Sequence, residues 1–323
     1  MRSTTRALAL FAAASLFAAC AKNTSGLTPS IPGASDARGA GSSTQSFTTG
    51  TRFLDSGKSK SSIDTSDFQY NVKPILKPMN ATDESANALP PPSVCVGIYG
   101  LACYTPAEIR SAYNVPSALN GAGQTIVIVD AYGSPTINRD LKYFDAYFHL
   151  PDPTFNIIYP SGPPAGASNG WAGETSLDVE WAHAIAPAAT IDLVIAKTNS
   201  SVDIDAAETY AVENHLGSVM SMSYGAPEQA ISGGSNNKYL KHGDVVFQEA
   251  REARITSVAS TGDTGASFGT GTAVANYPSS DPLVTAVGGT NLFMSDAGAY
   301  QSEDVWNDTD PALCPFGCHY GPF

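Results

Sequence analysis

The sequence predicts an α/β fold in which a parallel β-sheet carries helices on both faces. Continuous apolar runs at 125–129, 190–196 and 255–260 alternate with longer segments of helical pattern. Strands have this apolar character when helices cover both faces of a parallel sheet. Hydrophobic residues make up 42% of the 323 residues, so the chain can close a core and is not disordered throughout.

The elements are expected in a regular order along the chain. Thr105-Pro106-Ala107-Glu108 predicts a helix start, with Thr at the N-cap, Pro at the first position and Glu at the third. After this helix we expect strand 125–129, helix 134–150, strand 155–159, helix 174–185, strand 190–196, helix 202–215, strand 218–221, helix 245–254 and strand 255–260. No GxGxxG follows the first strand and no GxxxxGK[ST] occurs, so a nucleotide cofactor is not expected.

Residues 1–20 predict an export signal. Arg2 and Arg6 precede an apolar run, 7–19, that is too short to span a bilayer. The tetrapeptide 17–20 resembles a lipobox, and cleavage there would leave a lipid-modified Cys20 at the new N-terminus. Cleavage by an ordinary signal peptidase after residue 21 is the alternative. We therefore expect an exported protein, held at the bacterial cell envelope through Cys20 or secreted.

The rest of the chain divides into a linker and a folded domain. Residues 21–92 are rich in Ser, Thr and Gly and predict a flexible linker, although the more apolar 68–79 could dock on the body. Residues 93–323 predict the folded domain. A net charge of −13 argues against a nucleic-acid partner, whose phosphates require clustered cations. We expect a monomer.

Four cysteines remain when Cys20 is set aside, and they form two local pairs. Cys95 lies near Cys103, and Cys314 lies near Cys318. In an oxidising compartment such pairs predict two short disulfides. Zinc binding is the alternative, but only one histidine, next to Cys318, is close in sequence to any of them.

Candidate chemistry lies in three acidic residues. Glu174 and Asp178 are four residues apart on a predicted helix and share one face. Two carboxylates so placed repel each other, so one should keep its proton to a higher pH than usual; a solvated acidic face is the alternative. Glu180 is expected on the opposite, solvated side. Asp263 lies between glycines directly after a strand, where a backbone can approach a ligand closely, or where it forms only a turn.

A series of motifs then resembles one known family. The motifs are Tyr104-Thr105-Pro106, Gly173-Glu174-x-x-Leu177-Asp178, Ala186-Pro187-x-Ala189-x-Ile191, Ser221-Met222-Ser223-Tyr224-Gly225, Gly262-Asp263-x-Gly265-Ala266, and Tyr277-Pro278-Ser279-Ser280 through Val287-Gly288-Gly289-Thr290. In this order they resemble the sedolisins (peptidase family S53), serine-carboxyl peptidases with a subtilisin-like fold. The resemblance covers roughly two thirds of the chain, from the region of Tyr104 to Trp306.

The resemblance implies a role for each acidic residue and a polypeptide substrate. Glu174 would be the general base for a nucleophilic serine, and Asp178 would orient Glu174 and share its proton. A protonated Asp263 would donate a hydrogen bond in the oxyanion hole. Ser221, Ser223 and Gly225 would belong to an edge strand that binds substrate by strand addition. Because carboxylic acids replace histidine, we expect an acid pH optimum and collapse near neutrality.

The resemblance is incomplete at the nucleophile. The family's Gly-Thr-Ser-like motif would follow the Gly-Gly-Thr strand, and its calcium site would lie further on; neither is found in the sequence. We therefore expect no cofactor in this chain and interpret it as a C-terminally incomplete member of the family. The alternative is an inactive exported lipoprotein that uses the remaining groove to bind peptides.

Two other enzyme classes fit the sequence less well. A conventional triad with Asp130 as its acid would need a histidine at a helix start, whereas His183 is followed by Ala and is expected to be structural. A glycosidase using Glu174 and Asp178 would need its carboxylates on both sides of a sugar, which neighbours on one helical turn rarely provide. No HExxH motif occurs, so a catalytic zinc is not expected.

Overall fold

The computed structural model describes residues 73–74, 89, 91–99, 102–166, 169–231, 238–263, 265–267 and 273–305. All of them belong to one compact unit. Cys20 and the Cys314–Cys318 pair lie outside the described residues. Within the described part of the chain, no helix is long and apolar enough to cross a membrane.

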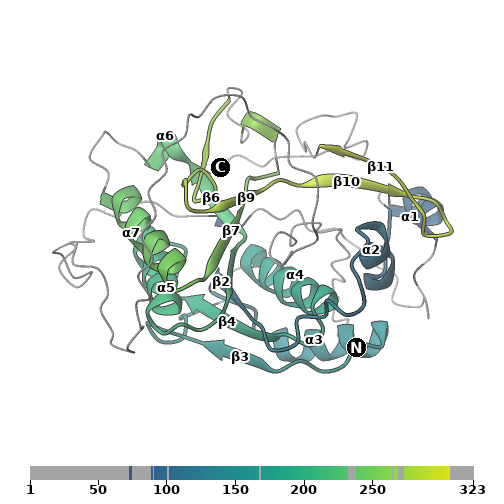
Figure 1. Ribbon diagram of the computed structural model, residues 1–323, viewed down its shortest axis with the longest axis horizontal. Helices are drawn as coiled ribbons and strands as arrows, with labels where there is room; N and C mark the ends of the chain where they lie inside the picture. The colour runs from purple at the N-terminus through teal and green to yellow at the C-terminus, as the bar shows by residue number, and fades with distance from the viewer. Residues whose placement is uncertain are drawn as a thin grey trace, which may run out of the picture. The chain divides into compact units, whose positions relative to one another are not determined.

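A parallel sheet of six strands forms the centre of the domain (Figure 1). The spatial order is β3-β4-β2-β5-β7-β9, and every neighbouring pair is parallel. The predicted α/β architecture is thus confirmed. The strands are β2 (Thr125–Ala131), β3 (Phe155–Ile158), β4 (Thr190–Ala196), β5 (Val219–Met222), β7 (Thr256–Ser260) and β9 (Thr285–Val287).

Helices cover both faces of this sheet because successive strand residues point to opposite sides. Val127 and Val129 of β2 pack in one core cluster with α5 and α7, whereas Ile128 packs in another with α3 and α4. Figure 1 shows the two helix pairs on either side of the strands. The helices are α3 (Ile137–Phe148), α4 (Asn169–Ile185), α5 (Ser201–Glu213), α6 (Glu228–Ile231) and α7 (Lys238–Glu252), with a 3-10 turn η2 (Gly265–Ser267).

The order of the strands creates a switch point between β2 and β5. The chain moves from β2 through β3 to β4 on one side of β2, and then crosses to β5, β7 and β9 on the other side. The carboxyl ends of β2 and β5 therefore flank this switch point. In open α/β sheets, ligands bind in a crevice outside the carboxyl ends of the strands at such a point.

Two smaller antiparallel assemblies pack beside the main sheet. One has the order β1 (Lys73–Pro74), β6 (Tyr224–Pro227) and β8 (Asn276–Tyr277). The other is the hairpin of β10 (Thr290–Met294) and β11 (Tyr300–Val305). Leu292 and Met294 of the hairpin enter a core cluster with Trp181 of α4, and the Tyr104 hydroxyl donates a hydrogen bond to the Leu292 carbonyl (2.6 Å).

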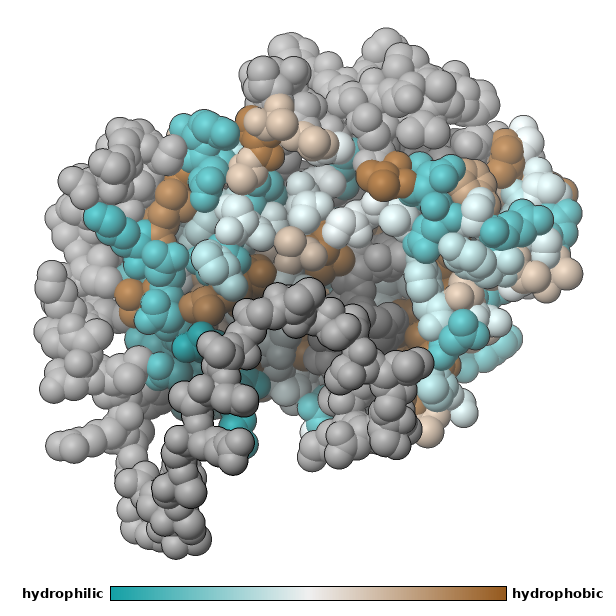
Figure 2. Space-filling model, turned by 45° about the horizontal axis from the view of Figure 1, so that its top comes forward, coloured by the Kyte–Doolittle hydropathy of each residue, from teal (hydrophilic) through white to brown (hydrophobic). Residues whose placement is uncertain are grey.

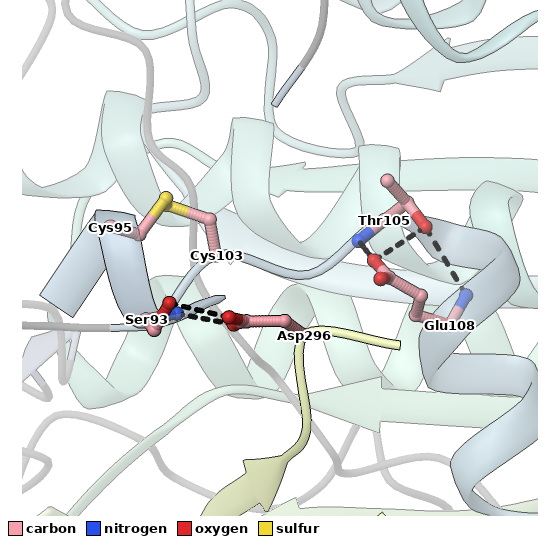
Figure 3. The surroundings of a disulfide bond; sticks show 6 residues. All are labelled: Ser93, Cys95, Cys103, Thr105, Glu108 and Asp296. Atoms are coloured by element: carbon pink, nitrogen blue, oxygen red, sulfur yellow. Dashed lines mark hydrogen bonds between the residues drawn. A yellow bond between two sulfur atoms is a disulfide. The ribbon is translucent and has the colours of Figure 1, made fainter. Parts of the chain in front are cut away.

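The start of the domain is held by a disulfide and a helix cap (Figure 3). Cys95, on α1 (Pro92–Tyr99), is bonded to Cys103 with a Cα–Cα distance of 5.7 Å. Ser93 donates two hydrogen bonds to Asp296 at the tip of the hairpin, from its backbone N–H (2.9 Å) and its hydroxyl (2.6 Å). Thus α1 is tied both to the following segment and to the hairpin.

The predicted capping box at α2 (Pro106–Ala112) is confirmed. The Thr105 side chain accepts from the Glu108 N–H (3.2 Å), while the Thr105 N–H donates to the Glu108 carboxylate (2.7 Å). The predicted helix at 174–185 starts earlier than expected, at Asn169. Its added turn buries Trp171, whose ring lies 6.1 Å from that of Tyr224, so packing extends the helix.

Candidate active site

Two predicted site carboxylates lie one turn apart on α4. Glu174 is 3% exposed, and Asp178 is partly buried. Among the described residues, Oε2 of Glu174 and Oδ2 of Asp178 are buried and have no hydrogen-bond partner. Buried carboxylate oxygens without donors favour the protonated form of the acid. These two oxygens are therefore positioned to hold protons.

A third carboxylate, Asp130, reaches this pair from the carboxyl end of β2. Asp130 is fully buried, and its pKa is raised well above the ordinary value by burial first and by the charge of Asp178 second. The sequence pointed to Asp130 only as the acid of a different triad. Its position directly after the apolar run of β2, on the edge where the crevice forms, is the signal that predicts its place in the site.

Asp263 approaches the same site from the turn that follows β7. Gly262 has a φ of 99°, a left-handed conformation that glycine adopts without strain. The Thr261 N–H donates to the Val287 carbonyl of β9 (2.9 Å), which holds the start of the turn against the sheet. The charge of Asp263 raises the pKa of Glu174, so the two acids are electrostatically coupled. The structure thus places Asp263 near enough to Glu174 for its charge to act on that acid, with the weakest effect of the three neighbouring acids.

Burial is the main cause of the unusual acidities here. It raises the pKa of Glu174 well above the ordinary value, and the charges of Asp178, Asp130 and Asp263 raise it further, in that order. Burial also raises the pKa of Asp178 to about 7, although a hydrogen bond from Ser223 opposes the shift. The group therefore loses its protons in steps that belong to the cluster as a whole.

Ser223 connects the acidic cluster to the junction between the main sheet and the small sheet. Its hydroxyl donates to Oδ1 of Asp178 (2.9 Å) from the junction between β5 and β6. The prediction that Ser221 lies in a substrate-binding edge strand is wrong. Ser221 is 8% exposed within β5, paired with Ile128 on one side and Val258 on the other, so its backbone cannot accept another strand.

Gly225 lies in β6, the middle strand of the small sheet, whose edge away from β8 already has a partner. Lys73 pairs with Gly225 and Pro74 with Tyr224, in an antiparallel arrangement. A side chain at Gly225 would collide with Asn276 of β8, since a Cβ there would lie 2.2 Å from Nδ2. Glycine at this position therefore lets β6 and β8 approach each other. The predicted linker, 21–92, thus contributes a strand to this edge.

A cavity of about 360 Å³ opens beside the turn that carries Asp263. None of the described residues that line it is charged: they are Thr261, Gly262, Gly265, Ala266, Val274, Ala275, Asn276, Ser279, Ser280, Ala286, Gly288, Gly289 and Val305. Most of these residues are small and come from the β7, β8 and β9 regions. Figure 2 shows hydrophobic and hydrophilic residues interspersed on the face in view, without one continuous apolar surface among the coloured residues.

A separate buried acidic group lies between α3 and α4. The expectation that Glu180 is solvated is wrong: it is 9% exposed, and burial raises its pKa to about 8 with help from the charges of Asp140 and Asp145. His183, as expected, is structural, with Nε2 2.8 Å from the Pro151 carbonyl and 3.3 Å from Oδ1 of Asp145. Helix α3 covers the face of α4 that carries Glu180, because the charges of Asp140 and Asp145 on α3 act on this carboxyl.

No group of three or more His, Cys, Asp or Glu side chains in the described ranges could hold a metal ion. The calcium site that the family resemblance implies would lie further along than the Gly-Gly-Thr strand, and it stays a prediction. No step of the chemistry below uses a metal ion.

Fold and site together define an α/β protein with acidic side chains gathered at the switch point of a parallel sheet. The solved Pseudomonas sedolisin, a serine-carboxyl proteinase complexed with two molecules of pseudo-iodotyrostatin, has a similar fold, with a TM-score of 0.57 and 26% identity over 63% of this chain and 58% of that chain. Kumamolisin from Bacillus sp. (strain MN-32) is 33% identical over 211 residues. These similarities point to the sedolisin family of serine-carboxyl peptidases.

A second curated relative supports this assignment. Sedolisin from Pseudomonas sp. (strain 101) is 27% identical over 223 residues. Each of the two alignments covers 64% of this chain and 37% of the relative, so the chain spans little more than a third of their length. No family model matches the chain.

Proposed function

We propose that this chain carries the carboxylate machinery of an acid-acting serine-type endopeptidase that hydrolyses polypeptides. The observation that carries the proposal is the coupling of Glu174 to three other acids, Asp178, Asp130 and Asp263, at one crevice. Such a cluster keeps protons at pH values where isolated carboxylic acids have lost them. A site of this kind suits proton transfer in acid, where a histidine base would already be protonated.

The three predicted residues take complementary parts in peptide hydrolysis. Ionised Glu174 accepts the proton of a serine hydroxyl as its oxygen bonds to the scissile carbonyl carbon. The carbonyl π electrons move onto oxygen, and protonated Asp263 donates a hydrogen bond to that oxyanion. The oxyanion electrons then re-form the carbonyl as the C–N bond breaks, and Glu174 gives its proton to the leaving amide nitrogen. Water next attacks the acyl ester and gives a proton to Glu174, which returns it to the serine oxygen as the ester C–O bond breaks. Asp178 holds Glu174 in place and shares its proton during these transfers.

The pH dependence follows from stepwise ionisation of the cluster. At the lowest pH all its members are protonated, and no base is present. The first ionisation creates the base while the remaining acids keep their protons as donors. Further ionisation as pH approaches neutrality removes the donor and adds repulsion. The rate should therefore pass through a maximum in acid and collapse near pH 7.

We propose that the substrate lies beside this machinery. An extended peptide would pair with the β6 edge at Gly225, and one of its side chains would enter the neighbouring cavity of about 360 Å³. The uncharged lining suits uncharged side chains. Because Lys73 and Pro74 already pair with this edge, a bound peptide must displace β1.

The second candidate function is peptide binding without hydrolysis. It is favoured by the sequence itself, in which no Gly-Thr-Ser motif supplies the nucleophile. Such a protein would keep the β6 edge and the cavity as a peptide site and would use the acidic cluster only to tune binding with pH.

One experiment separates the two. The full chain is incubated with internally quenched peptides from pH 2 to 8, and binding of a fluorescent peptide is measured in parallel by anisotropy. A peptidase cleaves with an acid maximum, and Glu174→Gln or Asp263→Asn lowers kcat at least about 100-fold. Asp192→Asn, at a buried strand acid hydrogen-bonded to Asn156 (2.7 Å), is the control and should keep its rate. Activity that stays flat up to pH 7 would exclude the acid mechanism, and binding without cleavage would favour the second candidate.

We also propose that the protein is exported and anchored through a lipid on Cys20. The support is the positive start, the short apolar run and the lipobox-like residues 17–20. Mass spectrometry of the membrane fraction should find the lipid on Cys20, and Cys20→Ala should move the protein into the soluble fraction. A mature N-terminus at Lys22 would instead identify an ordinary secreted protein.

A further inference from the structure

Tyr224, the first residue of β6, is enclosed between elements that carry the site. It is completely buried, and its ring lies 6.1 Å from that of Trp171, three residues before Glu174 on α4. It also directly follows Ser223, whose hydroxyl donates to Asp178. Tyr224 is therefore connected to both carboxylates of α4. It is connected to Asp178 through the backbone to Ser223, and to Glu174 through its packing against Trp171 on the same helix.

The hydroxyl of Tyr224 has an ionisable partner on a different helix. It donates to Oε1 of Glu208 on α5 (2.7 Å), and Glu208 is only 2% exposed. Burial, followed by the charge of Glu208, raises the pKa of Tyr224 well above the ordinary value, so the phenol keeps its proton and remains a donor. A hydrogen bond from a neutral donor to a buried carboxylate is among the stronger side-chain contacts.

The chain bends at the point that this contact holds. β5 ends at Met222 inside the main sheet, and β6 begins at Tyr224 in the small sheet, so Ser223 lies where the two sheets separate. A residue at such a junction is not held by strand pairing on both sides. The direction of its side chain therefore depends on the contacts that hold the neighbouring residues.

We propose that Glu208 is a positioning residue for the acidic cluster: through its hydrogen bond to Tyr224 it holds the Ser223 hydroxyl against Asp178. The inference rests on the proposed function only in giving Asp178 a part in peptide hydrolysis. In this arrangement Glu208 is a positioning residue and not a catalytic one. It acts from α5, across the junction of the two sheets, on a carboxylate carried by α4.

Other titratable groups surround both ends of this connection. Asp178 faces Asp130 of β2 and Glu174 of its own helix, with Asp263 acting on Glu174 from the turn after β7. Glu208 is surrounded by Tyr224, Tyr239 of α7 and Tyr277 of β8, whose pKa values its charge helps to raise. The Ser223 hydrogen bond lowers the pKa of Asp178, so loss of that bond should raise this pKa.

The test is a titration of Asp178 followed by carboxyl ¹³C NMR in the full chain, with the signal assigned by its loss in Asp178→Asn. Ser223→Ala should raise the pKa of Asp178 by about half to one pH unit, because the donor to the charged form is gone. Tyr224→Phe and Glu208→Leu each remove the Tyr224–Glu208 bond and should give at least half of that rise. Glu208→Gln retains an oxygen acceptor for the phenol, so in this variant the pKa of Asp178 should equal the wild-type value.

Tyr104→Phe is the matched control, because it removes a buried tyrosine hydroxyl that donates to Leu292 in the hairpin core (2.6 Å). It should leave Asp178 unchanged. The proposal is overturned if Tyr224→Phe and Glu208→Leu titrate like the wild type while Ser223→Ala does not, or if Ser223→Ala itself has no effect. Failure of both variants to fold, with Tyr104→Phe folded, would also overturn it, since Glu208 would then be a general requirement of the core.

The titration requires no turnover. Absence of hydrolysis by the wild-type chain would therefore contradict the proposed function and leave this inference standing. An unchanged pKa of Asp178 in Tyr224→Phe and Glu208→Leu would contradict the inference alone.

Discussion

Asp178 on α4 lies close enough to Asp130, at the end of β2, for its charge to raise the pKa of Asp130. Two acids from different elements are thus held together in a region that excludes water. Each is held there by separate packing, since α4 and β2 meet through Val179, Ala182 and Ile128 in one core cluster. The fold therefore holds the two carboxylates close together although they repel each other when ionised, and this favours their protonated forms.

Asp130→Asn should lower the pKa of Glu174, because a neighbouring negative charge disappears while the side-chain volume is retained. The activity maximum of a competent protein should move to lower pH in the same direction. A carboxyl ¹³C titration of Glu174 measures the change directly. Asp192→Asn, at the other end of a neighbouring strand, provides the control. If the pKa of Glu174 is unchanged in Asp130→Asn, Asp130 is not part of the cluster.

Stability should fall as pH rises from about 4.5 to 8, and Glu180→Gln should remove part of that fall. The folded-state pKa of Glu180 is about 8 against an ordinary 4.5, so in this window the folded state binds more protons than the unfolded state. The free energy of unfolding then decreases with pH. We expect the variant to lose on the order of 3 kcal/mol less than the wild type between pH 5 and 8.

Urea unfolding at the two pH values measures this difference. Glu252→Gln, at an exposed position near the end of α7, controls for the loss of one negative charge. An equal decline in Glu180→Gln and wild type would mean that Glu180 ionises in the folded protein at little cost.

The fold could be predicted from the sequence because apolar runs and helical segments alternate along it. The pair on α4 followed from helical periodicity alone, which fixes the angle between positions four apart. Neither Asp130 nor Asp263 could be joined to that pair by local pattern, because their approach depends on how β2, β7 and α4 pack. For Asp263, the family resemblance supplied what periodicity could not.

The two errors have a common physical origin. Ser221 was assigned to an edge and Glu180 to solvent, and in both cases a neighbouring element covers the residue. Local sequence shows which residues share a face, but it does not show what covers that face. For Ser221 a signal was present, since the flanking Met220 and Met222 are the apolar neighbours expected of an interior strand.

Gly243→Ala in α7 should destabilise the fold, while Gly97→Ala in α1 should not. A Cβ at Gly243 would lie 1.6 Å from the Tyr277 hydroxyl, whereas at Gly97 nothing lies within 4 Å. We expect Gly243→Ala to cost about 1–3 kcal/mol through overpacking, and Gly97→Ala to gain up to about 1 kcal/mol from helix propensity. Urea unfolding of both variants measures the contrast. Equal stabilities would show that α7 moves away from Tyr277 without cost.

Removal of β1 should strengthen peptide binding at β6. Lys73 and Pro74 pair with Tyr224 and Gly225, the same backbone that an added peptide strand would use, so the chain competes with its own ligand. A tethered strand acts at a high effective concentration, and its deletion should raise peptide affinity about tenfold. Fluorescence anisotropy with a labelled peptide compares the full chain with a form lacking residues 70–78. A deletion of equal length at 30–38, in the Ser- and Gly-rich part, is the control. Unchanged affinity after the first deletion would mean that peptides bind elsewhere than at the β6 edge.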